Sequence, residues 1–167
     1  MPDICDLILD EHEHQRRRFA ELDEVRDAAA DVLARRWEPL ATLLERHAAA
    51  EEAIFYPALL QVGVAAEEET EDAISDHNDI RDAVRRANGV EPGSEEWWQA
   101  VRAAREANSD HMGEEERGAL ADLRAHDDAE GRRALGDRWT AWSAAHADGS
   151  GVPDHDRDPD AYIRGHA

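Results

Sequence analysis

The chain has 167 residues, of which 35% are charged, and its formal net charge is -21. This length suffices for one domain with a buried core, and the strong negative charge argues against binding to nucleic acid or to an anionic membrane. No apolar run is long enough to span a bilayer, and the first residues, MPDICDLILDEHEH, lack the pattern of a secretion signal. The single cysteine, Cys5, excludes an internal disulfide framework, so we expect a cytoplasmic protein.

The composition is typical of an all-α protein, because Ala, Glu, Arg and Leu dominate and aromatic and β-branched residues are sparse. The clearest loop is NGVEPGS, at 88–94, which combines Gly, Pro and a Ser N-cap. Apolar residues at helical spacing predict four long helices and a shorter fifth one. Their approximate ranges are 3–26, 31–61, 68–87, 94–124 and 129–147.

Long helices joined by short turns predict an up-down-up-down four-helix bundle over residues 1–126. We expect residues 127–147 to form an additional C-terminal helix packed on the bundle. Four tryptophans are predicted to form a packing cluster that anchors this helix: Trp97, Trp98, Trp139 and Trp142. The polar residues 148–167 are predicted to be a flexible, mobile tail.

Four of the nine histidines fall on the inner stripes of four different helices: His12, His47, His77 and His111. His12, for example, follows Ile8 by four residues and precedes Phe19 by seven, so it points into the core. A single core-facing histidine is more often a hydrogen-bonded packing residue than a metal ligand. The remaining histidines are assigned to the surface: His14, His126, His146, His155 and His166.

The spacing of the four inner histidines indicates an internal repeat. His12 and His47 are 35 residues apart, and His77 and His111 are 34 apart, so each pair spans one helical hairpin and returns to the same level. The returning helix carries HxxxEE both times, as HAAAEE from His47 and HMGEEE from His111. A third HxxxE, at His126, lies about 22 Å farther along a continuous helix and does not fit the repeat.

Four imidazoles and the carboxylates of Glu51 and Glu115 would therefore meet inside the bundle, where buried charge must be paired or bound to metal. This mixture of ligands suits iron, manganese or zinc, and six ligands are more than one tetrahedral zinc needs. We therefore predict two metal ions bridged by both glutamates, each with two histidines and open positions for a small molecule. The rival ferritin-like pattern needs Glu-x-x-His on two helices, and only Glu11 and His14 have that spacing.

The order His12, His47-x-x-x-Glu51, His77, His111-x-x-x-Glu115 resembles that of the hemerythrin-like proteins, the HHE cation-binding domain family, over about residues 3–126. The stretch HAAAEEAIFYP is similar to the family's second-helix signature. The resemblance implies a non-haem di-iron site with an oxo or hydroxo bridge, and makes manganese or zinc less favoured. The oxygen-carrying members have a second histidine in the third helix, where this chain has Arg81. In their last helix an aspartate follows the histidine by five residues, whereas here Glu115 follows His111 by four.

Tyr56 is a candidate additional ligand or redox group. On a regular helix it would face away from His47, but Pro57 cannot donate a hydrogen bond to the Ala53 carbonyl, and a π-bulge there would turn Tyr56 toward the metal. Interhelical packing is the alternative role for this side chain. Three further residues share the histidine faces and are candidates either to orient the ligands or to form salt bridges at the bundle ends: Gln15, Arg16 and Arg81.

Three functions are compatible with these patterns. The first is a di-iron protein that reacts with O2, H2O2 or NO, as a peroxidase-like, catalase-like or nitric-oxide-handling enzyme supplied by an unidentified reductant. The second is an oxygen or iron sensor, or an iron store, without turnover. The third is a metal-free helical interaction module whose acidic surface binds a basic partner.

Overall fold

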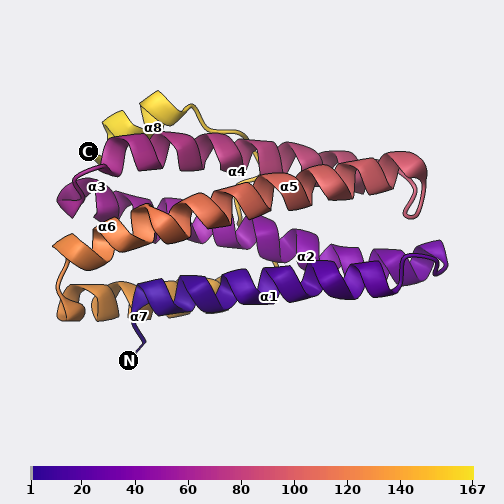
Figure 1. The fold of residues 1–167 in the computed structure, drawn as a ribbon, viewed down its shortest axis with the longest axis horizontal. Coiled ribbons are helices and arrows are strands. Elements are labelled where there is room, and N and C mark those ends of the chain that lie inside the picture. The colour runs from indigo at the N-terminus through magenta and orange to yellow at the C-terminus, as the bar shows by residue number, and fades with distance from the viewer. Residues whose placement is uncertain (1) are drawn as a thin grey trace.

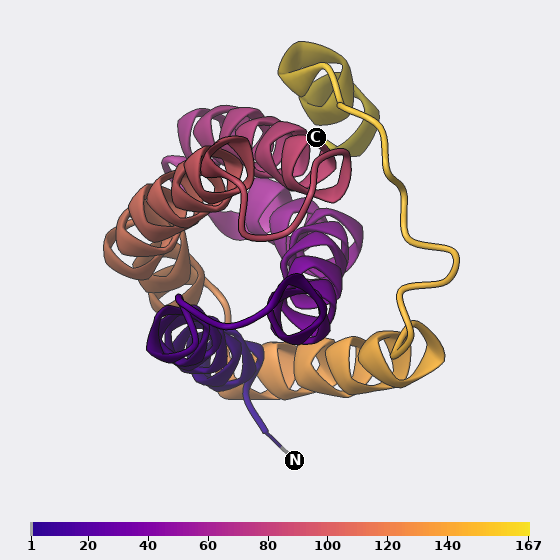
Figure 2. The same cartoon turned by 90° about the vertical axis from the view of Figure 1, so that its right-hand side faces the viewer.

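In the computed structural model, which describes residues 2–167, four long helices run antiparallel to one another (Figure 1). They are α1 (Ile4–Glu24), α2 (Ala30–Ala50), α4 (Ala66–Asn88) and α5 (Glu95–Arg117). Seen along the bundle axis, the four surround a common interior (Figure 2). The predicted all-α, up-down-up-down four-helix bundle is confirmed. None of the helices within residues 2–167 is long and apolar enough to cross a membrane.

Two of the predicted long helices are interrupted. The second contains a π-helical turn, η1 (Glu51–Phe55), followed by α3 (Tyr56–Val62). The Tyr56 amide donates to the carbonyl of Glu51, five residues back, and Pro57, which has no amide hydrogen, follows directly. The predicted helix over 94–124 also breaks, because α5 ends before Gly118 and α6 (Ala119–His126) begins after it.

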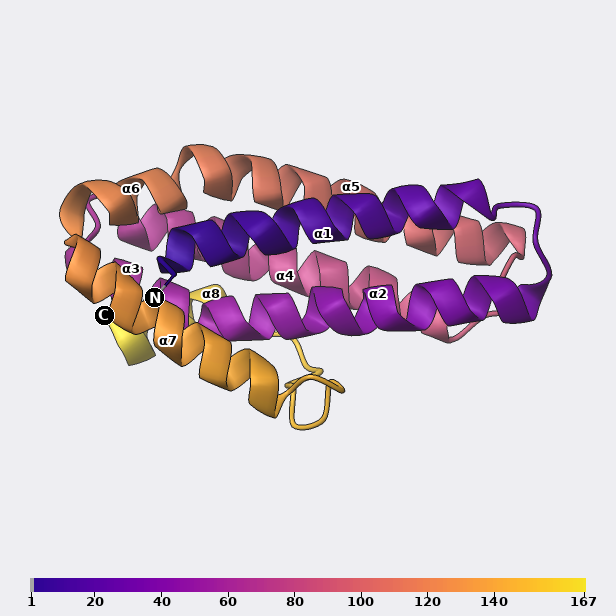
Figure 3. The ribbon, with the colours of Figure 1, turned by 90° about the horizontal axis from the view of Figure 1, so that it is seen from below.

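The fifth predicted helix is present as α7 (Ala129–Ala145), which begins at an Asp128 N-cap whose carboxylate accepts from the amides of Glu130 and Gly131. It crosses the outside of α1 and α2 (Figure 3). Its Trp139 side chain is 2% exposed and belongs to the apolar core.

The expectation of an unstructured tail over 148–167 needs correction, because a further helix, α8 (Pro159–His166), packs against α4 and α3. Asp158 caps this helix by accepting from the Ala161 amide, and Pro159 occupies its first turn. Tyr162 is buried and provides the apolar contact that holds the helix on the bundle. One buried tyrosine in a short helix produces too weak a helical periodicity of apolar residues to predict this helix from a polar sequence.

The core consists of two apolar clusters separated by a polar layer. One cluster joins the start of α1 to η1, α3, α6 and α7, and includes Ile8, Phe55 and Trp139. The other fills the far half of the bundle and includes Trp37 and Trp97. The predicted single tryptophan cluster is therefore wrong: Trp97 and Trp98 pack with Trp37, whereas Trp139 and Trp142 belong to the opposite cluster.

Candidate metal centre

The polar layer contains all six candidate metal ligands, and each is at most 2% exposed. They form two groups in which the potential ligand atoms lie within 4.8 Å of one another. The first group is His12, His47, Glu51 and Glu115, and the second is Glu51, His77 and His111. Glu51 belongs to both groups, so the layer has the form of a paired site with one shared carboxylate.

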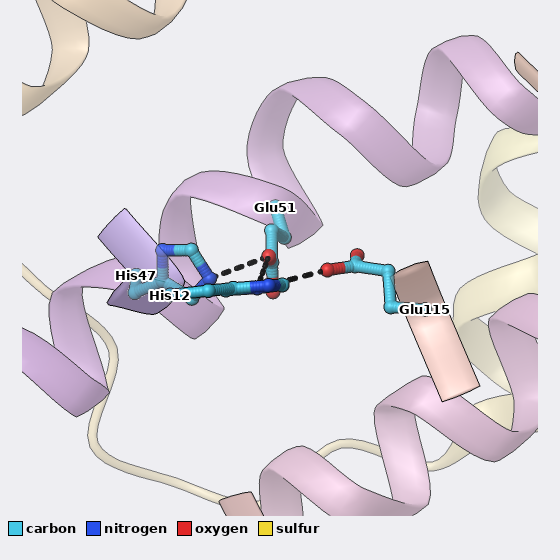
Figure 4. Close-up of side chains that lie close together, drawn as sticks. All are labelled: His12, His47, Glu51 and Glu115. Carbon is cyan, nitrogen blue, oxygen red and sulfur yellow. Dashed lines mark ion pairs between the residues drawn. The ribbon is translucent and has the colours of Figure 1, made fainter. Parts of the chain in front are cut away.

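The four side chains of the first group point toward one another and are joined by ion pairs (Figure 4). The Nε2 atom of His47 lies 2.7 Å from Oε1 of Glu51, and that of His12 lies 3.2 Å from Oε2 of Glu115. These four atoms are buried, yet none makes a hydrogen bond of acceptable geometry. Orphaned buried nitrogen and oxygen atoms that face one another are costly unless a cation lies between them, so this donor set fits a metal ion.

In the second group, two imidazoles face the other oxygen of the shared carboxylate. Oε2 of Glu51 lies 3.0 Å from Nε2 of His77 and 3.4 Å from Nε2 of His111. The two Nε2 atoms are 3.2 Å apart. Glu115 does not complete this group, since it shares a group only with His12, His47 and Glu51. The structure thus gives one shared carboxylate instead of the two predicted bridges.

Each of the four imidazoles has an acidic partner on its outer nitrogen, Nδ1. The distances are 2.9 Å for His12–Glu116, His47–Glu11 and His77–Glu52, and 3.6 Å for His111–Asp76. A carboxylate at Nδ1 fixes the ring and favours the tautomer whose Nε2 lone pair faces inward. All four Nε2 atoms thus point to the interior of the layer.

These four acidic partners were missed by the sequence analysis, although they follow the repeat. Glu52 and Glu116 are the second glutamates of the two HxxxEE copies, and each reaches the outgoing histidine of the other hairpin. Glu11 and Asp76 directly precede the two outgoing histidines, and each faces the returning histidine of its own hairpin. Comparison of the two copies at every acidic position would have found them.

The three predicted supporting residues differ in their contacts. Arg81 is buried and its Nη2 donates to Oε1 of Glu52, at 2.6 Å. Arg16 makes the equivalent contact with Oε1 of Glu116, at 2.7 Å. Both arginines therefore act on the histidines through a carboxylate. Gln15 is buried as well, but its side chain bonds to Asn108 and not to a candidate ligand.

The Tyr56 side chain reaches the layer because of the π-helical turn. Its ring is fully buried, and its hydroxyl donates to Oε1 of Glu115 at 2.7 Å. Burial and the negative charges of Glu115 and Glu51 raise the pKa of Tyr56 well above its usual value, so the phenol keeps its proton. Tyr56 therefore holds one candidate ligand in place through a hydrogen bond.

The electrostatics of the layer favour positive charge at its centre. Burial alone would lower the pKa of His47, but the carboxylates of Glu51 and Glu11 outweigh it and raise this pKa to about 10. Burial would likewise raise the pKa of Glu51, yet the surrounding imidazoles, His47 first, hold it well below its usual value. Without metal, the protonated ring of His47 offsets part of the negative charge; a bound cation would take over that role.

A cavity of about 10 Å³ lies beside His111 of the second group and Glu115 of the first. Tyr56, His111 and Glu115 line it, together with acidic residues that include Glu69 and Asp72. This volume accommodates about one water molecule. The cavity thus has the size expected for a very small ligand.

The chain matches a known protein family. A family model described as the hemerythrin HHE cation binding domain matches residues 3–123. No curated protein and no solved structure matches the chain. The matched range contains all six candidate ligands and ends before α7 and α8.

Proposed function

The chain belongs to the hemerythrin HHE cation-binding domain family, and from this premise we propose that its buried histidine–glutamate layer holds two iron ions and reacts with a small oxidant. His12, His47, Glu51 and Glu115 would hold one ion. Glu51, His77 and His111 would hold the other. The observation that carries the proposal is the shared Glu51, which faces imidazoles of both groups with its two separate oxygens.

The donor set supports a redox-active metal. Histidine and carboxylate together suit iron, and a pair of positions exceeds what one structural zinc requires. When bound, two irons would supply one-electron redox chemistry toward peroxide, nitric oxide or O2. The protein's contribution is the fixed set of imidazoles, each oriented by its own carboxylate, in an interior closed to bulk water.

The unequal sizes of the two groups support an open position on the His77 and His111 side, where three residues and not four converge. The small cavity at Tyr56 reaches this side at His111, and its volume would suit a molecule of a few atoms. Tyr56 keeps its proton and orients Glu115 beside the cavity. We therefore favour a peroxidase-like or catalase-like reaction of a small oxidant over a reaction with a larger organic substrate.

The second candidate is a sensor or iron store without turnover. The observation that favours it is the small volume of the cavity, which would limit exchange of substrate and product. Both candidates share the same ligands and differ in catalysis. The metal-free interaction module is the weaker hypothesis, because it leaves the buried Nε2 and carboxylate oxygens of the first group without hydrogen bonds of acceptable geometry.

Metal analysis of protein purified from iron-supplemented cells tests the proposal. We expect one iron for each of the two ligand groups, and loss of iron and of peroxide turnover in His47→Ala. His126→Ala is the matched control, because His126 has the same HxxxE spacing but lies exposed on α6. Bound iron without turnover of peroxide or nitric oxide would favour the sensor or store. Protein that binds no metal in the presence of excess iron would refute both the enzyme and the sensor or store.

A further inference from the structure

Glu52 is a buried carboxylate that the C-terminal segment covers. Its Oε1 contacts Nδ1 of His77 at 2.9 Å and Nη2 of Arg81 at 2.6 Å. Its Oε2 forms an ion pair with Nε of Arg157 at 2.6 Å, without the alignment of a hydrogen bond. The hydroxyl of Tyr162 donates to the backbone carbonyl of Glu52 at 2.5 Å. Residues from beyond the matched domain thus hold Glu52 from the outside.

Arg157 is fixed by its main chain next to His77. The Arg157 amide donates to Oδ1 of Asn78 at 2.9 Å, and its carbonyl accepts from Nδ2 of the same side chain at 2.8 Å. Asn78 directly follows His77 on α4. The guanidinium also lies over the ring of Tyr162, 5.8 Å from its centroid. In the end-on view the chain leading to α8 passes outside the bundle before it docks (Figure 2).

The other half of the repeat lacks this cover. Glu116, the counterpart of Glu52, contacts His12 and Arg16, but its side chain is 28% exposed, against 0% for Glu52. A carboxylate that is fully buried is costly unless polar or charged groups pair with its oxygens, whereas a partly exposed one is also stabilised by water. Arg81 is the partner on one side of Glu52, and Arg157 is the partner on the other.

We propose that Arg157, supported by Tyr162, is a positioning residue for the second metal position: it fixes Glu52 and, through Glu52, the ring of His77. The C-terminal segment is thereby part of the centre formed by Glu51, His77 and His111. This inference rests on the proposed metal-binding function. A carboxylate that orients a ligating imidazole changes metal affinity by about 10–100-fold when it is removed, so loss of Arg157 should act on this position and leave the other unchanged.

Titration of the full-length, metal-free protein with Zn²⁺, which is redox-inert, tests the proposal. In Arg157→Ala we expect one of the two equivalents to bind more weakly, by up to the roughly 10–100-fold that loss of the orienting carboxylate itself would cause, and the other to bind as in the wild type. Arg164→Ala is the matched control, because Arg164 lies exposed on α8, and it should change neither equivalent. Partial recovery in Arg157→Lys would support the role of the charge.

A double variant separates positioning from general stabilisation. If Arg157 acts through Glu52, Arg157→Ala should have no further effect on Zn²⁺ affinity in a Glu52→Gln background. An additional loss in that background, an equal loss at both equivalents, or unchanged affinity in Arg157→Ala would overturn the proposal.

Histidine-ring NMR of the metal-free protein provides a readout independent of metal. The Nδ1 signal of His77 should shift in Arg157→Ala while that of His12 stays in place, and an unchanged His77 signal would overturn the inference. Wild-type protein that binds no Zn²⁺ and no iron would refute the proposed function, whereas the NMR comparison would still decide whether Arg157 positions His77.

Discussion

Replacement of Tyr56 by phenylalanine separates its two predicted roles. The ring is fully buried, and the variant keeps that ring while it removes the hydroxyl that donates to Oε1 of Glu115 at 2.7 Å. A hydrogen bond to a charged group contributes about 1.5–3 kcal/mol, so Tyr56→Phe should lower the free energy of unfolding of the metal-free protein by that amount. If Tyr56 were only a packing residue, the variant would keep its buried ring and the free energy of unfolding would stay nearly unchanged.

Urea denaturation of chelator-treated protein measures this difference. The transition midpoint should fall with an unchanged slope, and the melting temperature should drop by roughly 3–12 °C, given about 2–4 °C per kcal/mol for a chain of this size. Glu115→Gln and the double variant complete a cycle that isolates the pair. Effects of Tyr56→Phe and Glu115→Gln that simply add would refute the hydrogen bond as the source of the stabilisation.

Three further predictions concern the support of the centre. Trp139→Ala should cost about 3–5 kcal/mol in urea denaturation, because this buried ring packs edge-on against His47 at 5.6 Å; a loss below about 1 kcal/mol would mean that α7 does not dock there. Metal binding should release protons. Glu51 and Glu11 raise the pKa of His47 to about 10 although burial lowers it, and the proton on this ring must leave before the metal binds. Zn²⁺ affinity should therefore rise with pH between 6 and 8, and calorimetry in buffers of different ionisation enthalpy would detect the protons; equal enthalpies in all buffers would contradict this. Ser94→Ala should cost about 1 kcal/mol through loss of the N-cap of α5, whereas Ser75→Ala, at an exposed position of α4, should cost far less in the same assay.

The bundle and its inner histidines could be predicted because one periodicity encodes both. His12, His47, His77 and His111 stand at positions where a helix of 3.6 residues per turn requires an apolar side chain, so each polar ring is conspicuous. The loop at 88–94 also fixes the midpoint of the second hairpin. Four stripes of equal register then imply that the rings meet at one level, as the two groups of ligand atoms do.

Helical periodicity could not single out the outer carboxylates, because acidic residues occur throughout a chain of net charge -21; only their recurrence in both copies of the repeat sets them apart. Glu11, Asp76 and Glu116 are each adjacent to a candidate ligand, a position where an acidic residue carries little information here. The contact of Arg157 with Glu52 depends on how residues 148–158 cross the bundle, and no local pattern encodes that path. The break at Gly118 was also missed, since one glycine is tolerated within many helices.

The difference between the two halves of the repeat follows from the helix geometry at HxxxEE. Consecutive side chains on an α-helix point about 100° apart. On a regular helix, Glu51 and Glu52 could therefore not both face the interior of the bundle. The π-helical turn that ends before Pro57 widens the helix there, and both carboxylates become buried. The second copy has Ala121 at the place of Pro57 and remains α-helical through Arg117, so Glu116 stays partly in water. The π-helical turn thus places a second carboxylate toward the bundle on one side of the centre, and the C-terminal segment completes its burial through Arg157 and Tyr162.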